Sequence, residues 1–242
     1  MAEKDTTVKI LMIAATHGNE LLGIKLHQRL LQKRSPLLEH INFMIGNPRA
    51  FAAKKRYIDC DLNRSYGVNG QLYEQQRAAE IAAYISETKP DIVLDMHTTS
   101  CIQPNCLIVG NLDGAAKRRL LAASHITTIL AVQPMNDVAT LGNNVVGYEI
   151  PNRSITPALL DTVAEDLQRF VDNQLAYPHK KLYRMQNKIY KSDVSAAQAG
   201  TFVNFEMHEL GYVPIMTGEN SYKKQTNYLG FKSSAPEKIT IQ

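Results

Sequence analysis

Apolar runs and amphipathic segments alternate along most of the chain. The apolar runs are typical of strands buried on both faces of a sheet, and they fall at residues 10–15, 41–46, 91–99, 107–109 and 145–150. The amphipathic segments predict helices at residues 21–31, 71–88, 115–124 and 157–175. Strands that alternate with helices indicate an α/β fold whose sheet is covered by helices on both faces.

The pattern changes after Tyr177. Beyond it no long helix is predicted, and short strand-like pieces fall at residues 182–190, 201–207 and 212–217. We therefore predict a main domain at residues 1–176 and a small β-rich C-terminal subdomain at residues 177–242 that covers the active end of the sheet. Residues 49–64 are rich in charge and poor in periodicity, which predicts a loop that is either solvated surface or the lining of a site.

Length and charge exclude several classes of protein. With 242 residues the chain can form one large domain, alone or with a small appendage. The net charge of +4 tolerates an anionic substrate, but no basic run is interleaved with aromatics and tryptophan is absent, so we expect no nucleic-acid partner. No apolar run approaches the roughly 18 residues that a membrane span needs, and we expect no membrane partner.

The N-terminus and the cysteines favour a cytoplasmic protein. Residues 1–7 are charged and polar, without the apolar core of a signal peptide. The three cysteines, at positions 60, 101 and 106, cannot form a complete disulfide framework and lack a CxxC spacing. We interpret them as small buried or half-buried thiols with no role as metal ligands.

Two predicted strands end in side chains that can bind a metal. The first apolar run ends in His17-Gly18-Asn19-Glu20, where a histidine and a glutamate three residues apart can face one point. His97 ends the third run, and ligands of open α/β sheets bind at the carboxyl ends of strands. Together His17, Glu20 and His97 would form the His₂Glu set of several catalytic zinc enzymes. Because an isolated HxxE also occurs by chance, spacing alone leaves both interpretations open.

Two further acids lie inside apolar runs. Asp95 precedes His97 by two residues on the same strand face, so it can accept the second imidazole N–H and fix the tautomer. Glu149 is costly to bury unless it is paired or lies near a cation. It is therefore either a general base beside a metal or a structural partner of an arginine such as Arg153, and the pattern leaves both open.

Five blocks of sequence together resemble the aspartoacylase/succinylglutamate desuccinylase family, a branch of the zinc carboxypeptidase-like hydrolases. They are HGNE at 17–20, NPRA at 47–50, RYIDCDLNR at 56–64, DMHTT at 95–99 and Glu149. The blocks run in order through most of the first 175 residues, and RYIDCDLNR is especially close to aspartoacylases. The resemblance implies a zinc-carboxypeptidase-like mixed sheet flanked by helices, with a zinc hydrolase catalytic domain at residues 1–176.

The resemblance also implies roles for individual residues. His17, Glu20 and His97 would bind one Zn²⁺ per subunit, and Glu149 would be the general base. Arg56 would polarise the scissile carbonyl and stabilise the oxyanion. Asn63 and Arg64 would hold the substrate carboxylate, and Asp61 would orient the arginines. Tyr222, in the ENSY stretch at 219–222, would close the pocket. For Tyr222 an exposed or packed side chain is the alternative.

The sequence departs from aspartoacylases where they grip the aspartate side chain. An ungapped alignment puts Met135 and Ala139 at the positions of the family's additional tyrosine and arginine, and neither side chain can bind a carboxylate. The segment after Glu149 also differs from the usual VGPQ-type sequence. A replacement cation would have to come from Arg153, Lys223 or Lys224, for each of which a solvated surface charge is the alternative.

We therefore expect a zinc-dependent deacylase that cleaves a small anionic N-acyl amino acid to a carboxylate and a free amino acid. One rival is a metallocarboxypeptidase that removes C-terminal residues from peptides on the same scaffold. Another is a non-enzymatic metal-binding relative, against which the complete chemical set argues. The sequence is compatible with a homo-oligomer.

Overall fold

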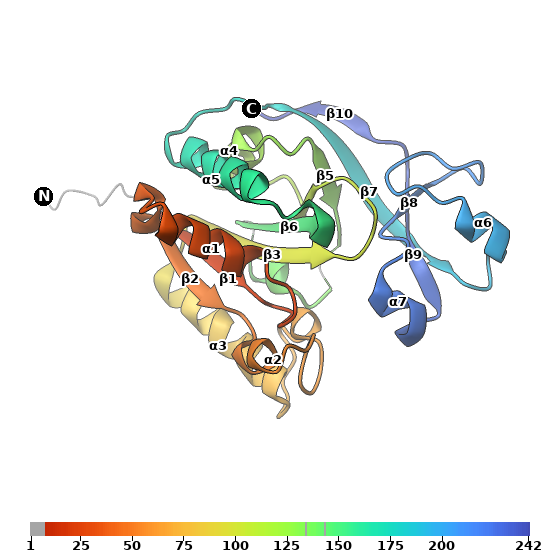
Figure 1. Cartoon of the computed structure of the whole chain (residues 1–242), viewed down its shortest axis with the longest axis horizontal. Coiled ribbons are helices and arrows are strands. Elements are labelled where there is room, and N and C mark those ends of the chain that lie inside the picture. The colour runs from red at the N-terminus through yellow and green to blue at the C-terminus, as the bar shows by residue number, and fades with distance from the viewer. Residues whose placement is uncertain (1–7, 134, 143) are drawn as a thin grey trace, which may run out of the picture.

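The structure is a computed structural model, and it describes residues 8–133, 135–142 and 144–242. Ten strands of these residues form one continuous sheet (Figure 1). They are β1 (Ile10–Ala14), β2 (Ile41–Ile45), β3 (Ile92–Thr99), β4 (Cys106–Val109), β5 (Thr128–Ala131), β6 (Val145–Pro151), β7 (His179–Tyr190), β8 (Val213–Ile215), β9 (Tyr228–Ser233) and β10 (Glu237–Thr240). The helices are α1 (Leu22–Gln32), α2 (Pro48–Ala52), α3 (Tyr73–Thr88), α4 (Ala115–Ala123), α5 (Pro157–Val171), α6 (Ala196–Gly200) and α7 (Asn220–Gln225), with short 3₁₀ turns between them.

The sheet is mixed, as the sequence predicts. Its order is β2-β1-β3-β6-β4-β5-β7-β9-β8, with β10 paired to β7. Strands β2, β1, β3 and β6 are parallel, so their carboxyl ends meet at one edge. Strand β4 is antiparallel to β6, and its register places Cys106 opposite Glu149. The edge where His17, His97 and Glu149 lie is therefore built from strand ends that are distant in sequence.

Helices cover both faces of the sheet (Figure 1). On one face, α1, α4 and α5 pack on alternate strand residues such as Met12, Leu94 and Tyr148. On the other face, α3 packs on the residues between them, such as Ile13 and Val93. Side chains alternate along a strand, so Asp95, His97 and Glu149 share the second face, beyond the end of the α3 cluster.

The C-terminal segment continues the main sheet. The first half of β7 pairs with β5 and β10, and its second half pairs with β9. Strands β7, β8 and β9 enclose a third apolar cluster that includes Ile215 and Phe231. Residues 177–242 therefore share backbone hydrogen bonds with the main sheet, and the division at residue 176 stays a prediction.

Three sequence-based expectations differ from the structure. Part of the loop predicted at 49–64 is helical, because Asn47 caps α2 by accepting a hydrogen bond from the Ala50 N–H and Pro48 occupies the first helical position. The predicted strand at 201–207 is absent, since Phe205 has a positive φ of 66° and the Asn204 side chain bonds Thr217 instead. Strands β5, β9 and β10 were not predicted.

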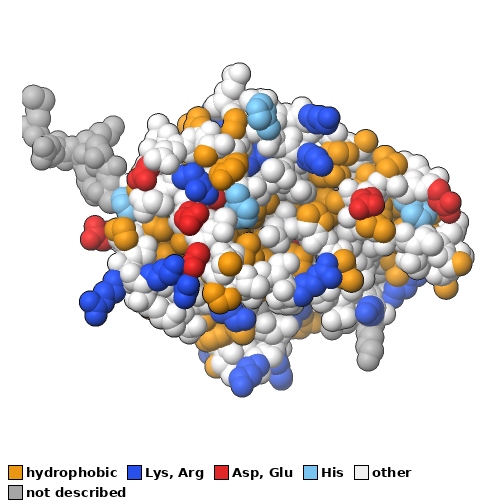
Figure 2. All heavy atoms as spheres, turned by 45° about the horizontal axis from the view of Figure 1, so that its top comes forward, with side chains coloured by type: hydrophobic (Ala, Val, Ile, Leu, Met, Phe, Trp, Pro, Cys, Tyr) orange, Lys and Arg blue, Asp and Glu red, His pale blue; other side chains and the backbone are white. Residues whose placement is uncertain are grey.

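None of the helices in the described residues is both long and apolar enough to span a bilayer. On the face shown in Figure 2, basic side chains are scattered among acidic and apolar ones and form no single patch. This distribution gives no support to a nucleic-acid surface on that face.

Lys180 is buried in β7, where its Nζ donates to the carbonyl oxygens of Ser124 and Ile126 at 2.6 and 2.8 Å. Burial lowers the pKa of Lys180 from 10.5 to about 8, with the Asp166 carboxylate opposing the shift. Above pH 8 the unfolded chain therefore holds more protons at this position than the folded protein, so Lys180 makes stability rise with pH up to about 10.4.

We expect the Lys180→Met variant to lack this rise. The free energy of unfolding of the wild type minus that of the variant should increase between about pH 7 and about pH 10.5 by about 3 kcal/mol, at 1.36 kcal/mol per pKa unit. Urea denaturation of both proteins at several pH values measures it. A difference that stays flat over this range would show that Lys180 titrates normally.

Candidate active site

The turn after β1 brings His17 and Glu20 together. Ala15 has a positive φ of 52°, which turns the chain sharply out of the strand. Gly18 then passes so close to α2 that a Cβ at this position would lie 2.1 Å from the carbonyl carbon of Ala50. A side chain at position 18 would displace the turn, and the HGNE stretch therefore needs this glycine.

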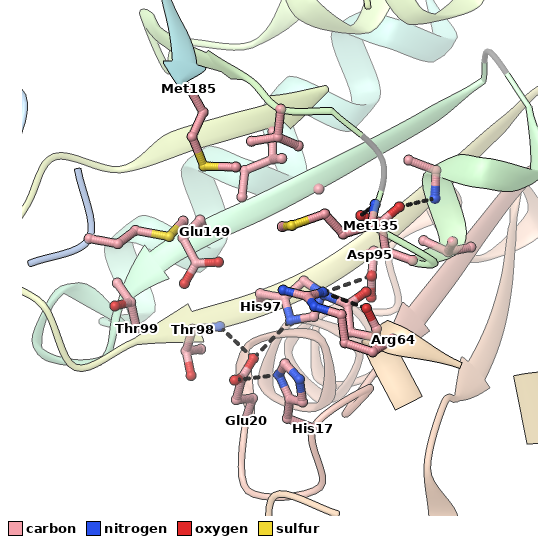
Figure 3. Close-up of a pocket in the computed structure, with 18 of the residues that line it drawn as sticks. His17, Glu20, Arg64, Asp95, His97, Thr98, Thr99, Met135, Glu149 and Met185 are labelled. Atoms are coloured by element: carbon pink, nitrogen blue, oxygen red, sulfur yellow. Dashed lines mark hydrogen bonds and ion pairs between the residues drawn. The ribbon is translucent and has the colours of Figure 1, made fainter. Parts of the chain in front are cut away.

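His17, Glu20 and His97 offer ligand atoms that all lie within 4.8 Å of one another, and all three residues are buried. Nδ1 of His17 lies 2.7 Å from Glu20 Oε1, and Nδ1 of His97 lies 3.1 Å from Glu20 Oε2 (Figure 3). Two imidazole nitrogens and a carboxylate that face one point form a donor set that suits a divalent transition metal such as zinc.

A second carboxylate holds the far nitrogen of each histidine. Asp95 Oδ2 lies 2.7 Å from His97 Nε2, while its other oxygen accepts a hydrogen bond from the Thr16 hydroxyl at 2.6 Å. Asp61 Oδ1 lies 3.0 Å from His17 Nε2. Such partners fix the ring orientation and leave Nδ1 of each imidazole directed at Glu20.

These carboxylates dominate the local electrostatics. Burial lowers the pKa of His17, but the charges of Glu20 and Asp61 outweigh burial, so the pKa is raised. For the Glu20 carboxyl, burial by itself raises the pKa, but the neighbouring His17 and His97 outweigh burial and hold the pKa well below its usual range. The cluster therefore carries an excess of negative charge unless the histidines are protonated or a metal cation binds between the three side chains.

Replacing Asp95 by asparagine should weaken metal binding at the cluster. The variant would lose the negative charge that holds the His97 ring, and loss of such a partner typically lowers metal affinity about 10–100-fold. Competition with a chromophoric chelator measures this affinity. The exposed acid Asp193, changed to asparagine, is the matched control and should bind zinc as the wild type does. Equal affinities in all three proteins would contradict this role of Asp95.

Glu149 lies beside the cluster on β6, in register with His97 on β3 (Figure 3). Burial is the main cause that raises the pKa of Glu149 to about 8. The charge of Glu20 adds to this rise, and His97 opposes it. Among the described residues Glu149 has no hydrogen-bond or ion-pair partner, and Arg153 is exposed. The alternative that Glu149 pairs with Arg153 is therefore wrong.

The stretch from Arg56 to Arg64 lies along the opening of the site. Arg56 is 3.4 Å from both Glu20 Oε1 and Asp61 Oδ2. Burial lowers the pKa of Arg56, but the charges of Glu20 and Asp61 outweigh burial, so the pKa is raised. The Asn63 side chain has no hydrogen bond within the described residues, and its Oδ1 is buried. Arg64 donates to the Asn63 carbonyl and has no ion-pair partner in the part of the chain that the structure describes.

The C-terminal segment supplies one wall of the cavity. Tyr222 was expected there from the family resemblance, but the contacts of Glu219 were not. Glu219 Oε2 accepts hydrogen bonds from the Thr99 hydroxyl at 2.6 Å and from the Ser100 N–H at 2.9 Å. These contacts tie the start of α7 to the end of β3. They hold Tyr222 over the cavity, where its ring packs on Tyr228 and Phe231 with centroids 4.8 and 6.0 Å away.

A cavity of about 130 Å³ joins all these groups. Its lining includes His17, Glu20, Arg56, Asn63, Arg64, Asp95, His97, Glu149, Glu219 and Tyr222. Met135 and Ala139 also line it, whereas Arg153 and Lys223 do not, and the Lys224 side chain lies outside the described part. The site residues expected from the sequence thus share one cavity, apart from Asp61, which contacts it through His17 and Arg56.

The mixed sheet and the buried His-Glu-His cluster at its strand ends define a zinc-carboxypeptidase-like fold. The model of the succinylglutamate desuccinylase/aspartoacylase catalytic domain matches residues 6–151. A probable aspartoacylase from Prochlorococcus marinus strain SARG is 35% identical over 243 aligned positions, which cover 87% of this chain and 78% of that protein. The chain belongs to the succinylglutamate desuccinylase/aspartoacylase family.

Other relatives match over a shorter segment. A probable aspartoacylase from a Nostoc strain is 36% identical over 118 residues, which span 43% of this chain and 40% of that protein. Among solved structures, murine aminoacylase 3 has a TM-score of 0.72 at 20% identity, covering 98% of each chain. A succinylglutamate desuccinylase from Chromobacterium violaceum has a TM-score of 0.74 at 18% identity, covering 97% of this chain and 86% of that one. The structural matches establish the fold.

Proposed function

We propose that the protein is a zinc-dependent amidohydrolase that cleaves the linear amide of a small N-acyl amino acid to a carboxylate and a free amino acid. One observation carries the proposal. A buried His-Glu-His cluster, an unpaired buried Glu149 and a guanidinium with no ion pair line one cavity in a member of a family named for desuccinylases and aspartoacylases.

The metal would be held by Nδ1 of His17, Nδ1 of His97 and the Glu20 carboxylate, with one Zn²⁺ per subunit. Bound there, the ion supplies Lewis-acid catalysis to the scissile carbonyl and to water. Asp95 and Asp61 keep both imidazoles in the orientation that this binding needs.

Glu149 acts as the general base. In the metal-free protein burial raises its pKa to about 8, and a cation bound beside it would favour the ionised carboxylate that can accept a proton. Its carboxylate takes a proton from the attacking water at Oε and then delivers it to the amine that leaves. No hydrogen bond to the described residues restrains either oxygen, so both are free to exchange protons with the substrate.

Arg56 and the pair Asn63 and Arg64 position the substrate. The Arg56 guanidinium lies beside Glu20 and can stabilise negative charge on the carbonyl oxygen as it develops. Arg64 binds the amino-acid carboxylate through its planar fork, and the unbonded Asn63 amide adds a further contact. Holding the carboxylate keeps the scissile carbon near the reacting groups, which lowers the entropic part of the barrier.

The size of the cavity supports a small substrate. The cavity has a volume of only about 130 Å³ and is walled on one side by the C-terminal segment, which favours an acyl amino acid over a longer peptide. The wall formed by Glu219 and Tyr222 adds to this restriction.

The zinc-loaded protein should release free amine from N-acyl amino acids and leave dipeptides uncleaved. The test is a turnover panel of N-acetyl, N-succinyl and aromatic N-acyl amino acids, with dipeptides as controls. Efficient cleavage of dipeptides would favour the carboxypeptidase, and no turnover of any acyl amino acid would favour the non-enzymatic relative.

Replacing Arg64 by alanine should raise KM more than it lowers kcat. Charged hydrogen bonds contribute about 1.5–3 kcal/mol, so we expect kcat/KM to fall roughly ten- to hundredfold. Arg153→Ala is the matched control, because Arg153 is exposed and outside the cavity lining. A larger loss in the Arg153 variant than in the Arg64 variant would place the carboxylate anchor elsewhere.

A further inference from the structure

One wall of the cavity is apolar. It is formed by side chains from β4, β7, β9 and the segments after β5 and β8, namely Ile108, Val132, Met185, Met216 and Phe231. Most of these residues belong to, or pack on, the third apolar cluster, so the wall is the cavity-facing side of a packed core. Met185 of this wall and Glu149 line the same cavity (Figure 3).

Strand β6 adds uncharged residues to the cavity lining beside this wall. Val145 and Gly147 share the strand face of Glu149, Gly147 is the register partner of Ile108 on β4, and Met135 also lines the cavity. A Cβ at position 147 would lie 3.2 Å from the Cβ of Ile108, tighter than an ordinary contact. The glycine therefore avoids crowding Ile108 and leaves room beside it in the cavity lining. A glycine inside a strand often marks the close approach of a ligand.

The charges of the cavity admit only one anionic group. Among the described lining residues the carboxylates are Glu20, Asp95, Asp137, Glu149 and Glu219, and the guanidiniums are Arg56 and Arg64. Arg56 is already engaged by Glu20 and Asp61. Arg64 remains for one substrate carboxylate. The proposed zinc would face the scissile carbonyl, so a second substrate carboxylate would be desolvated among acids with no cation left to pair with.

We propose that the substrate carries a single carboxylate, and that its side chain is apolar and of medium size, lying over Gly147 against Ile108 and Met185 of the apolar wall and against Met135. N-acyl aspartate, N-acyl glutamate and N-succinyl amino acids are excluded by their second charge. The methionines are flexible and polarisable, so the wall adapts to aliphatic and aromatic side chains. This inference rests on the proposed function and specifies its substrate class.

Binding to an inactive variant tests the inference apart from turnover. N-acetylleucine and N-acetylaspartate have nearly the same shape and differ in the charge of the side chain. We expect the zinc-loaded Glu149→Gln variant to bind N-acetylleucine at least tenfold more tightly than N-acetylaspartate in isothermal titration calorimetry. Turnover by the wild type should show the same order, and N-butyryl-leucine should be cleaved at least tenfold faster than N-succinyl-leucine.

The possible outcomes distinguish an error in the substrate class from an error in the deacylase function itself. Equal or tighter binding of N-acetylaspartate, with turnover of both, would overturn the apolar substrate class and leave the deacylase intact. Turnover of neither compound together with no measurable binding would overturn the deacylase and the inference with it.

A pair of methionine variants locates the side chain in the cavity. Met185→Ala removes part of the apolar wall and so enlarges the cavity. The kcat/KM for N-acetylphenylalanine relative to that for N-acetylalanine should therefore change by at least threefold. Met207→Ala is the matched control, since Met207 is 55% exposed and does not line the cavity. The same ratio in the wild type and both variants would show that Met185 does not contact the substrate.

Discussion

The Glu149→Gln variant should bind zinc as the wild type does and lose nearly all turnover. The substitution keeps the shape of the side chain and removes the group that accepts a proton, and general-base catalysis contributes about 10²–10⁴-fold to rate. We therefore expect kcat to fall by a factor in that range while the zinc content stays at one ion per chain. Steady-state kinetics and metal analysis of the same preparation measure both quantities.

The environment of Glu149 makes this expectation specific. Its carboxylate is buried beside His97, with no hydrogen-bond partner among the described residues. A structural carboxylate in that position would be paired. Glu165→Gln on the exposed face of α5 is a suitable control and should leave kcat unchanged. Full activity of the Glu149 variant would refute its role as the base.

His97→Ala should lose both the metal and the activity. Removing one of three ligands leaves Glu20 and Asp95 as neighbouring buried acids with no imidazole between them. We expect zinc content below about a tenth of an ion per chain, because two protein ligands rarely retain zinc against a chelator. Loss of activity should follow in proportion to the loss of metal.

A second histidine–aspartate pair separates metal loss from general destabilisation. His125 Nδ1 lies 2.6 Å from the buried Asp166 Oδ2, outside the cavity lining, in a pairing similar to that of His97 and Asp95. The His125→Ala variant should lose stability in thermal unfolding and keep its zinc. If both variants lost zinc equally, the loss would reflect folding, and the ligand role of His97 would be unsupported.

The metal cluster could be predicted because each of its residues lies at or just beyond the carboxyl end of a predicted strand. His17, Glu20 and His97 each follow an apolar run, and parallel strands bring their carboxyl ends to one edge. The pairing of Asp95 with His97 was also predictable, since the two residues share a strand face. The partner of His17 was not, because Asp61 reaches it from a loop 44 residues further along the chain.

The contacts that fix the C-terminal wall escaped prediction for a similar reason, although the resemblance placed Tyr222 in the site. Glu219 contacts Thr99 and Ser100 across about 120 residues of sequence, and no periodicity signals such a contact. Strands β9 and β10 are short and partly exposed, so their hydrophobic pattern is weak. The apolar wall of the cavity depends on where β7, β9 and the segment after β8 lie, and it became visible only in the folded chain.

A crystal of the zinc-loaded protein, measured at the zinc absorption edge, tests the central claim most directly. We predict one strong anomalous peak per chain, about 2.0–2.2 Å from Nδ1 of His17, Nδ1 of His97 and a carboxylate oxygen of Glu20. A metal-replete crystal with no peak between these three side chains, or with its zinc bound elsewhere, would contradict the account.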